Sequence, residues 1–422
     1  MNPLGSIARE CQFCHNERMA PSTFGWVDFA EGDRAKMTEV IKLFSEPEAR
    51  DELGLGTVRD ALADLLFPGT STIQTRARYF LFVPWVYLRH EQRRTPASEV
   101  ARLARRDEVK LIGLLSESND HRGIIGYLSR ESLERLPSAI YWAGLAVWGI
   151  RRYPGSQDSY HRNFDMLSHP LHRLVLDDDG NPTERGHAST WDPLLPKAPA
   201  DFLERVEFAL RKEEAVYLQQ RLLSLRPQSL LAHLVSRTRP AEETDFIWNH
   251  PEADGFPARL REQVEHARAF SELMHGAALL YNAMIAELPP IKEELAAYYR
   301  QRFSDWALHI QSRPELRTWR QQAFWSLVLD TGARVSAPTR RFIETWLRRA
   351  LERPSPEHLF MDAEAREQIR RRELELKNFQ RARLANPRAR ERWTEASGAE
   401  QLGFRWFRAR TIAADILRGL EA

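Results

Sequence analysis

Hydroxyl and guanidinium side chains that could bind an anion gather in one stretch, LLFPGTSTIQTRARYFLFVPWVYLRH, between Leu65 and His90. The candidate phosphate ligands follow its Pro-Gly break and are Thr70, Ser71, Thr72, Arg76 and Arg78. Unpaired amides and the positive end of the helix dipole attract anions at a helix N-terminus. The stretch therefore predicts a helix that begins among residues 70–72 and runs to about His90, with an anion site at its start.

The same residues also fit a purely structural interpretation. A threonine or serine hydroxyl can cap the helix, while Arg76 and Arg78 pair with acidic neighbours such as Asp60 or Asp64. After Arg78 the stretch is apolar nearly all round, which is typical of a helix in the middle of a domain. Its apolar run is too short to span a bilayer and contains Pro84. We therefore expect a buried helix that is kinked at Pro84.

Arginine is concentrated in two zones that could bind nucleic acid. Residues 76–106 contain eight arginines against two acidic residues, and residues 366–392 contain ten Lys or Arg against four Glu. Basic groups supply sequence-independent affinity for a phosphate backbone. Besides Arg76 and Arg78, the predicted ligands are Arg89, Arg93, Arg94, Arg370, Arg381, Arg405 and Arg408. The alternative is a solvated helix face with pairs such as Glu367 with Arg371 and Glu373 with Lys377.

Composition limits the classes of protein that this chain can represent. It has 422 residues, 43% of them hydrophobic, which is enough to fill the cores of a folded globular protein. Its formal net charge is only +2, so any binding to nucleic acid must come from local patches. Cys11 and Cys14 are the only cysteines, so we expect no disulfide framework and a cytoplasmic protein.

The common cofactor and metal motifs do not explain this sequence. Cys11 to His15 has the spacing of haem attachment or of half a zinc site, but zinc would need two more ligands and no further cysteine exists. The sequence has no Walker loop, dinucleotide fingerprint or Gly-x-Ser-x-Gly elbow. We therefore predict no cofactor and no metal, and leave catalytic activity undecided.

A metal-dependent hydrolase or nuclease is the alternative function. Potential metal ligands concentrate in the irregular stretch 161–187, namely His161, His169, His172, Asp177, Asp178, Asp179 and His187. They equally fit a solvated loop, and Asp179-Gly180 after Val175 favours a hairpin turn. Glu272 and His275 have Glu-x-x-His spacing, but the adjacent Gly276 favours close helix packing instead.

Helical spacing of apolar residues covers most of the chain, and strand signals are almost absent. The predicted fold is mostly α, with multi-helix, bundle-like domains and one irregular insertion that carries a short β-hairpin. The expected segments are a mobile lead-in at 1–22, a helical domain at 23–153, an irregular insertion or connection at 154–200 and a helical domain at 201–422.

Several stretches resemble an uncharacterised bacterial family, a domain of unknown function. They are FGWVDF at Phe24 to Phe29, RDELGLGTVRDALADLLFPGTSTIQTRARYFLFVPW at Arg50 to Trp85, HARAFSELMHGAALLYNAMIAE at His266 to Glu287, and the closing FRWFRARTIAADILRGL. The resemblance implies a cytoplasmic protein of defence or mobile genomic islands and assigns no catalytic residue.

We therefore expect a non-catalytic component of an anti-phage or foreign-DNA defence complex. It would bind DNA or RNA, or a helicase or nuclease of the same locus, through its arginine-rich helices. No association with a membrane is expected.

Overall fold

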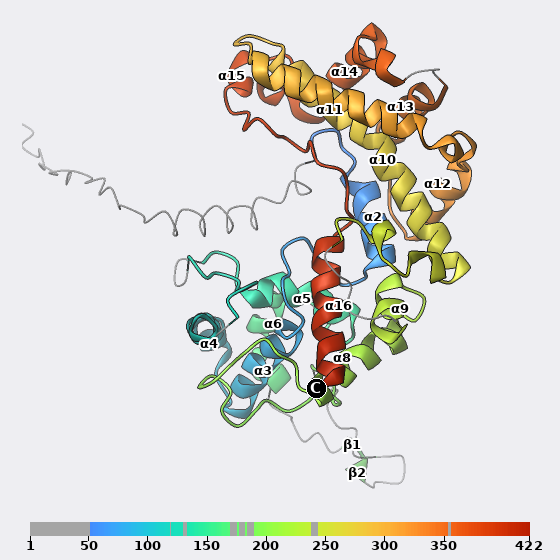
Figure 1. Cartoon of the computed structure of the whole chain (residues 1–422). Helices are drawn as coiled ribbons and strands as arrows, with labels where there is room; N and C mark the ends of the chain where they lie inside the picture. Colours follow the sequence, from blue (N-terminus) through green and yellow to red (C-terminus); the bar gives the residue numbers. More distant parts are fainter. Residues whose placement is uncertain are drawn as a thin grey trace, which may run out of the picture. The chain divides into compact units, whose positions relative to one another are not determined.

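In a computed structural model of the chain, the described residues are 51–118, 120–129, 133–168, 175–176, 182–183, 190–237, 244–352 and 356–422 (Figure 1). The expected lead-in at 1–22, both cysteines and the FGWVDF element lie outside them. The described residues belong to one compact unit. The domain boundaries expected near residues 153 and 200 stay predictions.

Helices dominate the described residues, which confirms the predicted mostly-α fold. The first part of the chain forms α2 (Gly56–Leu66), α3 (Tyr79–Gln92), α4 (Ala97–Glu117), α5 (Pro137–Val147), α6 (Gln157–Arg162), α7 (Phe164–Ser168), α8 (Lys212–Leu225) and α9 (Leu230–Arg237). The second part forms α10 (Ala258–Ala286), α11 (Glu293–Gln311), α12 (Gln321–Asp330), α13 (Ala337–Glu352), α14 (Ala363–Arg381), α15 (Pro387–Arg390) and α16 (Trp406–Glu421).

Among the described residues, short 3-10 turns and one pair of strands accompany the helices. The turns are η3 (Ile247–Asn249), η4 (Ala253–Gly255), η5 (Pro314–Thr318) and η6 (Pro356–Phe360). Strands β1 (Val175–Leu176) and β2 (Pro182–Thr183) pair antiparallel, with Val175 opposite Thr183. This pairing lies where the sequence predicts a hairpin.

Helix α3 is buried as expected, but it begins at Tyr79 and not among residues 70–72. The predicted helix start was wrong because tertiary partners satisfy the backbone of the preceding segment. The Tyr141 hydroxyl accepts hydrogen bonds from the amides of Thr75 and Arg76, at 2.8 and 3.1 Å. The amide of Ala77 donates to the Asp415 carboxylate at 3.0 Å. With acceptors supplied from elsewhere, these amides need no helical partners.

Aromatic packing holds α3 in the core. The Phe80 ring stacks on Trp148, with ring centroids 3.9 Å apart, and meets Tyr141 edge-on at 4.9 Å. Pro84 lies inside the helix, as predicted, and is itself buried. These contacts fix the first half of α3 in the core.

The long helix α10 organises the second part of the chain. It packs along α11, and Figure 1 shows these two helices side by side. The Trp306 indole of α11 donates to the carbonyl of Glu272 at 2.7 Å. A Cβ atom added at Gly276 would lie only 2.3 Å from the Trp306 ring, which explains the glycine that the sequence associates with close helix packing.

Gly276→Ala should lower the free energy of unfolding by roughly 1–3 kcal/mol, because the added methyl overpacks the α10–α11 contact. Denaturant unfolding followed by circular dichroism measures this loss. Gly113→Ala in α4 is the matched control, since nothing lies within 4 Å of its added Cβ. That control should gain roughly 0.5–1 kcal/mol from helix propensity alone. Equal effects at the two sites would contradict the packing explanation.

Candidate functional site

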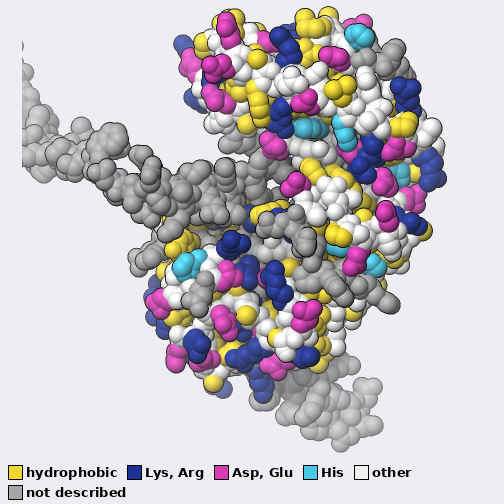
Figure 2. Space-filling view, in the orientation of Figure 1, with side chains coloured by type: hydrophobic (Ala, Val, Ile, Leu, Met, Phe, Trp, Pro, Cys, Tyr) yellow, Lys and Arg dark blue, Asp and Glu magenta, His cyan; other side chains and the backbone are white. Residues whose placement is uncertain are grey.

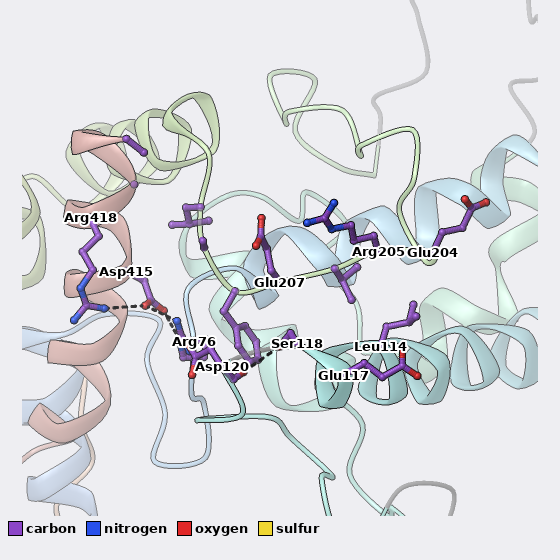
Figure 3. Close-up of a pocket in the computed structure, with 16 residues that line it drawn as sticks. Arg76, Leu114, Glu117, Ser118, Asp120, Glu204, Arg205, Glu207, Asp415 and Arg418 are labelled. Atoms are coloured by element: carbon purple, nitrogen blue, oxygen red, sulfur yellow. Dashed lines mark hydrogen bonds and ion pairs between the residues drawn. The ribbon is translucent and has the colours of Figure 1, made fainter.

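Arg76 joins three distant segments of the chain through its side chain (Figure 3). Its guanidinium donates to both oxygens of Asp415 of α16, at 2.9 and 3.1 Å. It also pairs with Asp120 and lies 4.4 Å from the centre of the Phe208 ring. Arg76 and Asp415 are both buried. Partial burial raises the pKa of the Asp120 carboxyl, but the nearby Arg76 lowers it more, so this pKa lies below its usual value.

The anion expected near the start of α3 is therefore a carboxylate of the protein itself. Asp415 accepts from the amide of Ala77 and from Arg76, so it occupies the place that the sequence assigned to phosphate. Arg78 is equally committed, because it pairs with Glu214 at 2.8 Å and donates to the carbonyl of Glu207 at 2.9 Å. Asp415 and Glu214 lie 339 and 136 residues away from these arginines, so no local pattern could have identified them.

The C-terminal arginines meet the same segment. Arg405 pairs with Asp60 and Asp64 and donates to the carbonyl of Thr70 at 2.8 Å. Arg408, which is buried, donates to the carbonyl of Thr72 at 2.8 Å.

The three hydroxyl residues of this segment do not act as helix caps. The Thr70 hydroxyl donates to the carbonyl of Phe67 at 2.7 Å. The Ser71 hydroxyl has no hydrogen-bond partner among the described residues. The structure thus brings Thr70, Thr72, Arg405 and Arg408 together, but it uses them in internal contacts.

A cavity of about 630 Å³ lies beside Arg76, between the end of α4, residues 204–210 and α16 (Figure 3). Its acidic lining residues are Glu117, Asp120, Glu204, Glu207 and Asp415, and its basic ones are Arg76, Arg205 and Arg418. Because acidic groups outnumber basic ones and Arg76 is already paired, this cavity does not favour a phosphate ligand.

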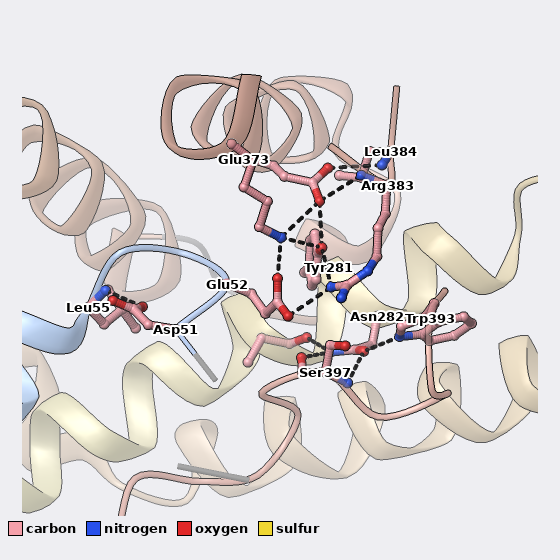
Figure 4. Close-up of polar contacts among 12 residues, drawn as sticks. Asp51, Glu52, Leu55, Tyr281, Asn282, Glu373, Arg383, Leu384, Trp393 and Ser397 are labelled. Atoms are coloured by element: carbon pink, nitrogen blue, oxygen red, sulfur yellow. Dashed lines mark hydrogen bonds and ion pairs between the residues drawn. The ribbon is translucent and has the colours of Figure 1, made fainter. Parts of the chain in front are cut away.

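The second arginine-rich zone forms a buried polar network (Figure 4). The Glu373 carboxylate, which is fully buried, accepts from the Tyr281 hydroxyl at 2.6 Å and from Lys377 at 3.1 Å. Glu52 pairs with Lys377 and Arg383. These two cations hold the pKa of Glu52 below its usual value, although burial, the largest single influence, raises it.

Of the two ion pairs predicted for this zone, one is found and the other differs by one position. The predicted pair of Glu373 with Lys377 is confirmed, although Glu373 is buried and not on a solvated face. Glu367 pairs with Arg370 at 2.7 Å, one position away from the predicted Arg371. Arg381 is exposed.

Four exposed arginines and the half-buried Arg89 gather where α3 ends and α4 begins. We call Arg89, Arg93, Arg94, Arg102 and Arg106 the α3–α4 basic surface. Arg89 of α3 and Arg106 of α4 approach the same carboxylate, that of Asp107, at 4.0 and 3.7 Å. This shared partner places Arg89 of α3 near Arg106 of α4. Lys110 extends it by one helical turn beyond Arg106 and is also exposed.

Most carboxylates near this surface are withdrawn from solvent. Asp107 and Glu108 are buried, and Glu91 is partly buried while it accepts from Tyr160, Thr190 and Trp191. Burial raises the pKa of Glu108 to about 7 and also raises that of Glu91. Glu99 remains exposed and pairs with Arg102. Burial raises the pKa of Asp107, but His90, Arg89 and Arg106 lower it more, so this carboxylate is ionised and compensates part of the charge of the two arginines. Glu99 is the exposed carboxylate beside the arginines of this surface.

Elsewhere the charges are mixed. On the face shown in Figure 2, basic and acidic side chains alternate over the described surface, in agreement with a net charge of +2. The α3–α4 basic surface is therefore a local feature, as the composition requires of any nucleic-acid site.

Most candidate ligands of the alternative metal site lie outside the described residues. The imidazole of His161 hydrogen-bonds the Tyr87 hydroxyl at 2.8 Å, while His169, His172, Asp177, Asp178, Asp179 and His187 lie outside the described residues. Within the described part of the chain, no three His, Cys, Asp or Glu side chains are arranged to hold a metal ion.

Glu272 of the Glu-x-x-His pair is held by cations of the protein. Its carboxylate pairs with Arg268 and Arg313, both at 2.8 Å, and with His309 at 3.2 Å. His275 lies against the carbonyl of Ala399 at 3.1 Å, and burial lowers its pKa to about 4. Its imidazole is thus neutral at physiological pH. The contacts of Glu272 are those of a structural network between α10 and α11.

Comparison with known proteins identifies the family. The model of DUF6361, a family of unknown function, matches residues 21–418. The chain belongs to this family. No curated protein and no solved structure matches it. The resemblance to a domain of unknown function is confirmed, while the genomic context of defence stays a prediction.

The described helices of this DUF6361 chain differ from what crossing a bilayer requires. Among the described residues, none of the helices combines the length and the apolar character that crossing a bilayer requires.

Asp415→Asn should lower the free energy of unfolding of this DUF6361 protein by about 3 kcal/mol or more, because it leaves the buried Arg76 partly uncompensated. Urea denaturation near neutral pH measures the loss. Glu344→Gln is the control, because it breaks an exposed pair with Arg340 that should contribute under about 1 kcal/mol. A loss at Asp415 no larger than at Glu344 would refute the role given to the buried pair.

Glu108→Gln should change how stability depends on pH. The folded protein binds the Glu108 proton more tightly than the unfolded chain, so the contribution of Glu108 to stability falls as pH rises from about 4.5 to about 7. The variant lacks this fall, and its unfolding free energy relative to the parent should rise by roughly 3 kcal/mol across that interval. Denaturation at about pH 5 and about pH 8 measures it; a constant difference would contradict a raised pKa.

Proposed function

We propose that this chain is a non-catalytic component of a bacterial anti-phage or foreign-DNA defence complex that binds nucleic acid through the α3–α4 basic surface. The observation that carries the proposal is the convergence of Arg89 and Arg106 on the buried Asp107. It gathers arginines from two helices while their neighbouring carboxylates are mostly buried. Arginine-rich surfaces of this kind attract phosphate backbones without regard to base sequence.

The conformation of Arg94 supports the proposal. Its φ is +52°, and the amides of Arg94 and Thr95 donate to the carbonyls of Glu91 and His90, both at 3.0 Å. These two bonds form the Schellman motif that ends α3, in which glycine usually takes the left-handed position. An arginine there costs roughly 1–2 kcal/mol. Strain of this kind at an exposed arginine favours a functional role for the side chain.

The proposal narrows the set of arginines expected from the sequence. Arg76, Arg78, Arg405 and Arg408 already hold carboxylates or carbonyls of the protein, so they are left out. Arg93 and Arg94 are exposed and form no ion pair among the described residues. The contacts of the surface with nucleic acid would come from Arg93 and Arg94, and from Arg102 and Arg106, which have few carboxylate partners.

The defence role is the part of the proposal that comes from the resemblance. A helicase or nuclease of the same locus is the protein partner that the resemblance implies. The surface described here would give such a partner a hold on DNA or RNA, without any catalytic group of its own.

Arg93→Ala/Arg102→Ala/Arg106→Ala should weaken binding to duplex and single-stranded DNA at least tenfold at about 50 mM salt. Because each lost phosphate contact removes about 0.9 from the slope of log K against log salt on duplex DNA, that slope should fall by about 2 to 3. Fluorescence anisotropy over a salt series measures both quantities.

The matched control for this experiment is Arg334→Ala/Arg341→Ala/Arg348→Ala, near and on α13. These arginines are exposed and form no ion pair among the described residues. The control should bind as the parent does. Absence of DNA binding by the parent at low salt, or equal losses in the two triple variants, would reject the proposal.

A further inference from the structure

The exposed side of α4 continues the α3–α4 basic surface along the helix axis. Arg102, Arg106 and Lys110 are all exposed and stand four residues apart, so they lie on the same side of α4. An α-helix rises 1.5 Å per residue, so the three residues extend over about 12 Å. We call them the α4 cation row. The row offers a line of positive charges to a ligand, and not a single charge.

Carboxylates compensate the α4 cation row only in part. Arg102 pairs with the exposed Glu99 at 2.6 Å, and Arg106 lies 3.7 Å from the buried Asp107. An exposed pair such as that of Arg102 is weak because water and salt screen it. Lys110 forms no ion pair among the described residues. With three cations against two carboxylates, the row keeps a net positive charge.

Beyond Lys110 the same side of α4 presents Gly113, a glycine that internal packing does not require. It follows Lys110 by three residues and Arg106 by seven, which places it in line with the row. It is exposed, and nothing lies within 4 Å of a Cβ atom added to it. A glycine inside a helix costs about 0.5–1 kcal/mol relative to alanine, but it lets a ligand approach the backbone closely. Gly113 therefore leaves the backbone of α4 open beside the row.

Aromatic side chains cannot contribute to binding at this surface. Between residues 79 and 117 the phenyl, phenol and indole rings all belong to α3, and all are buried, namely Tyr79, Phe80, Phe82, Trp85 and Tyr87. Proteins that bind single strands without sequence preference stack the bases on aromatic side chains, which contributes about 1–3 kcal/mol per base. The α3–α4 basic surface lacks this source of affinity for a single strand.

We infer that the α3–α4 basic surface binds double-stranded DNA in preference to single strands, and that the duplex lies along the α4 cation row with its backbone against Gly113. The inference deepens the proposed function and rests on it. A duplex carries one charge per about 1.7 Å of its axis, so it presents several phosphates to a row of this length. Lys110 and Gly113 thereby join the residues that contact the nucleic acid.

The size of the preference follows from counterion release. Each phosphate contact contributes about 0.9 to the slope of log K against log salt on a duplex, and about 0.7 on a single strand. With no stacking to offset this difference, about four contacts give roughly tenfold tighter binding of the duplex at about 50 mM salt, relative to about 1 M.

Fluorescence anisotropy of the full-length protein with a labelled duplex, and with one of its strands alone, measures this preference. The duplex should bind roughly tenfold more tightly at about 50 mM salt. Lys110→Ala should lower the salt slope on the duplex by about 0.9, because one phosphate contact is lost. Arg341→Ala on α13, at an exposed position, should leave the slope unchanged.

Gly113→Leu tests where the duplex lies. The substitution adds bulk without charge, so it should weaken duplex binding several-fold by keeping the phosphate backbone away from α4. Gly255→Leu is the matched control, since Gly255 is also exposed and has nothing within 4 Å of an added Cβ. The control should bind the duplex as the parent does. Circular dichroism verifies that both variants fold.

The outcomes separate the inference from the proposed function. Equal or tighter binding of the single strand, or equal duplex affinities of the Gly113 and Gly255 variants, overturns the inference. The basic surface still stands in that case if the Arg93, Arg102 and Arg106 variant loses DNA affinity. Absence of DNA binding by the parent rejects both.

Discussion

The buried ion pair of Arg76 with Asp415 is the interaction on which the first part of the chain depends. It connects the segment before α3 to the last helix, and Asp120 and Phe208 complete the surroundings of the guanidinium. Removing two charges from water costs several kcal/mol, which attraction repays only when the remaining donors are also bonded. Arg76 meets this condition through Asp415, Asp120 and the carbonyl of Arg122. The main role of the pair is therefore to specify how α16 packs against the segment before α3.

This constraint explains which features of the fold the sequence could predict. Apolar periodicity and the closeness implied by Gly276 are local properties, so the mostly-α fold, the burial of α3 and close helix packing at Gly276 were predicted correctly, whereas the partner helix α11 was not. The start of α3 was not, because Tyr141 and Asp415 supply acceptors for amides that the local pattern assigned to a helix. The sequence of a hydroxyl-rich segment after Pro-Gly does not reveal whether the anion that it binds is a ligand or a carboxylate from a distant part of the chain.

The candidate site shows the same division between local and distant information. Sequence identified the arginines of residues 76–106 as a group, but only the structure separates those held internally from those that face solvent. The spacing of Arg102, Arg106 and Lys110 on one side of α4 was a usable local signal for the exposed group. Burial of Glu108 has no such signal, since its environment is built by Ser138 of α5. Charge counts along a sequence therefore misjudge the field at such a surface.

Helix α3 thus has opposite roles at its two ends. At its start, arginines are bonded to carboxylates of α16 and α8, which fixes the helix but removes these cations from any ligand. At its end, the left-handed Arg94 and its neighbours remain in solvent, where contacts with a polyanion cost little desolvation. The centre of α3 is packed among aromatic side chains, so the position of its end is fixed relative to its start. Because the start is locked, the backbone that carries the arginines at the end is in place before any ligand arrives, which lowers the entropy that binding must overcome.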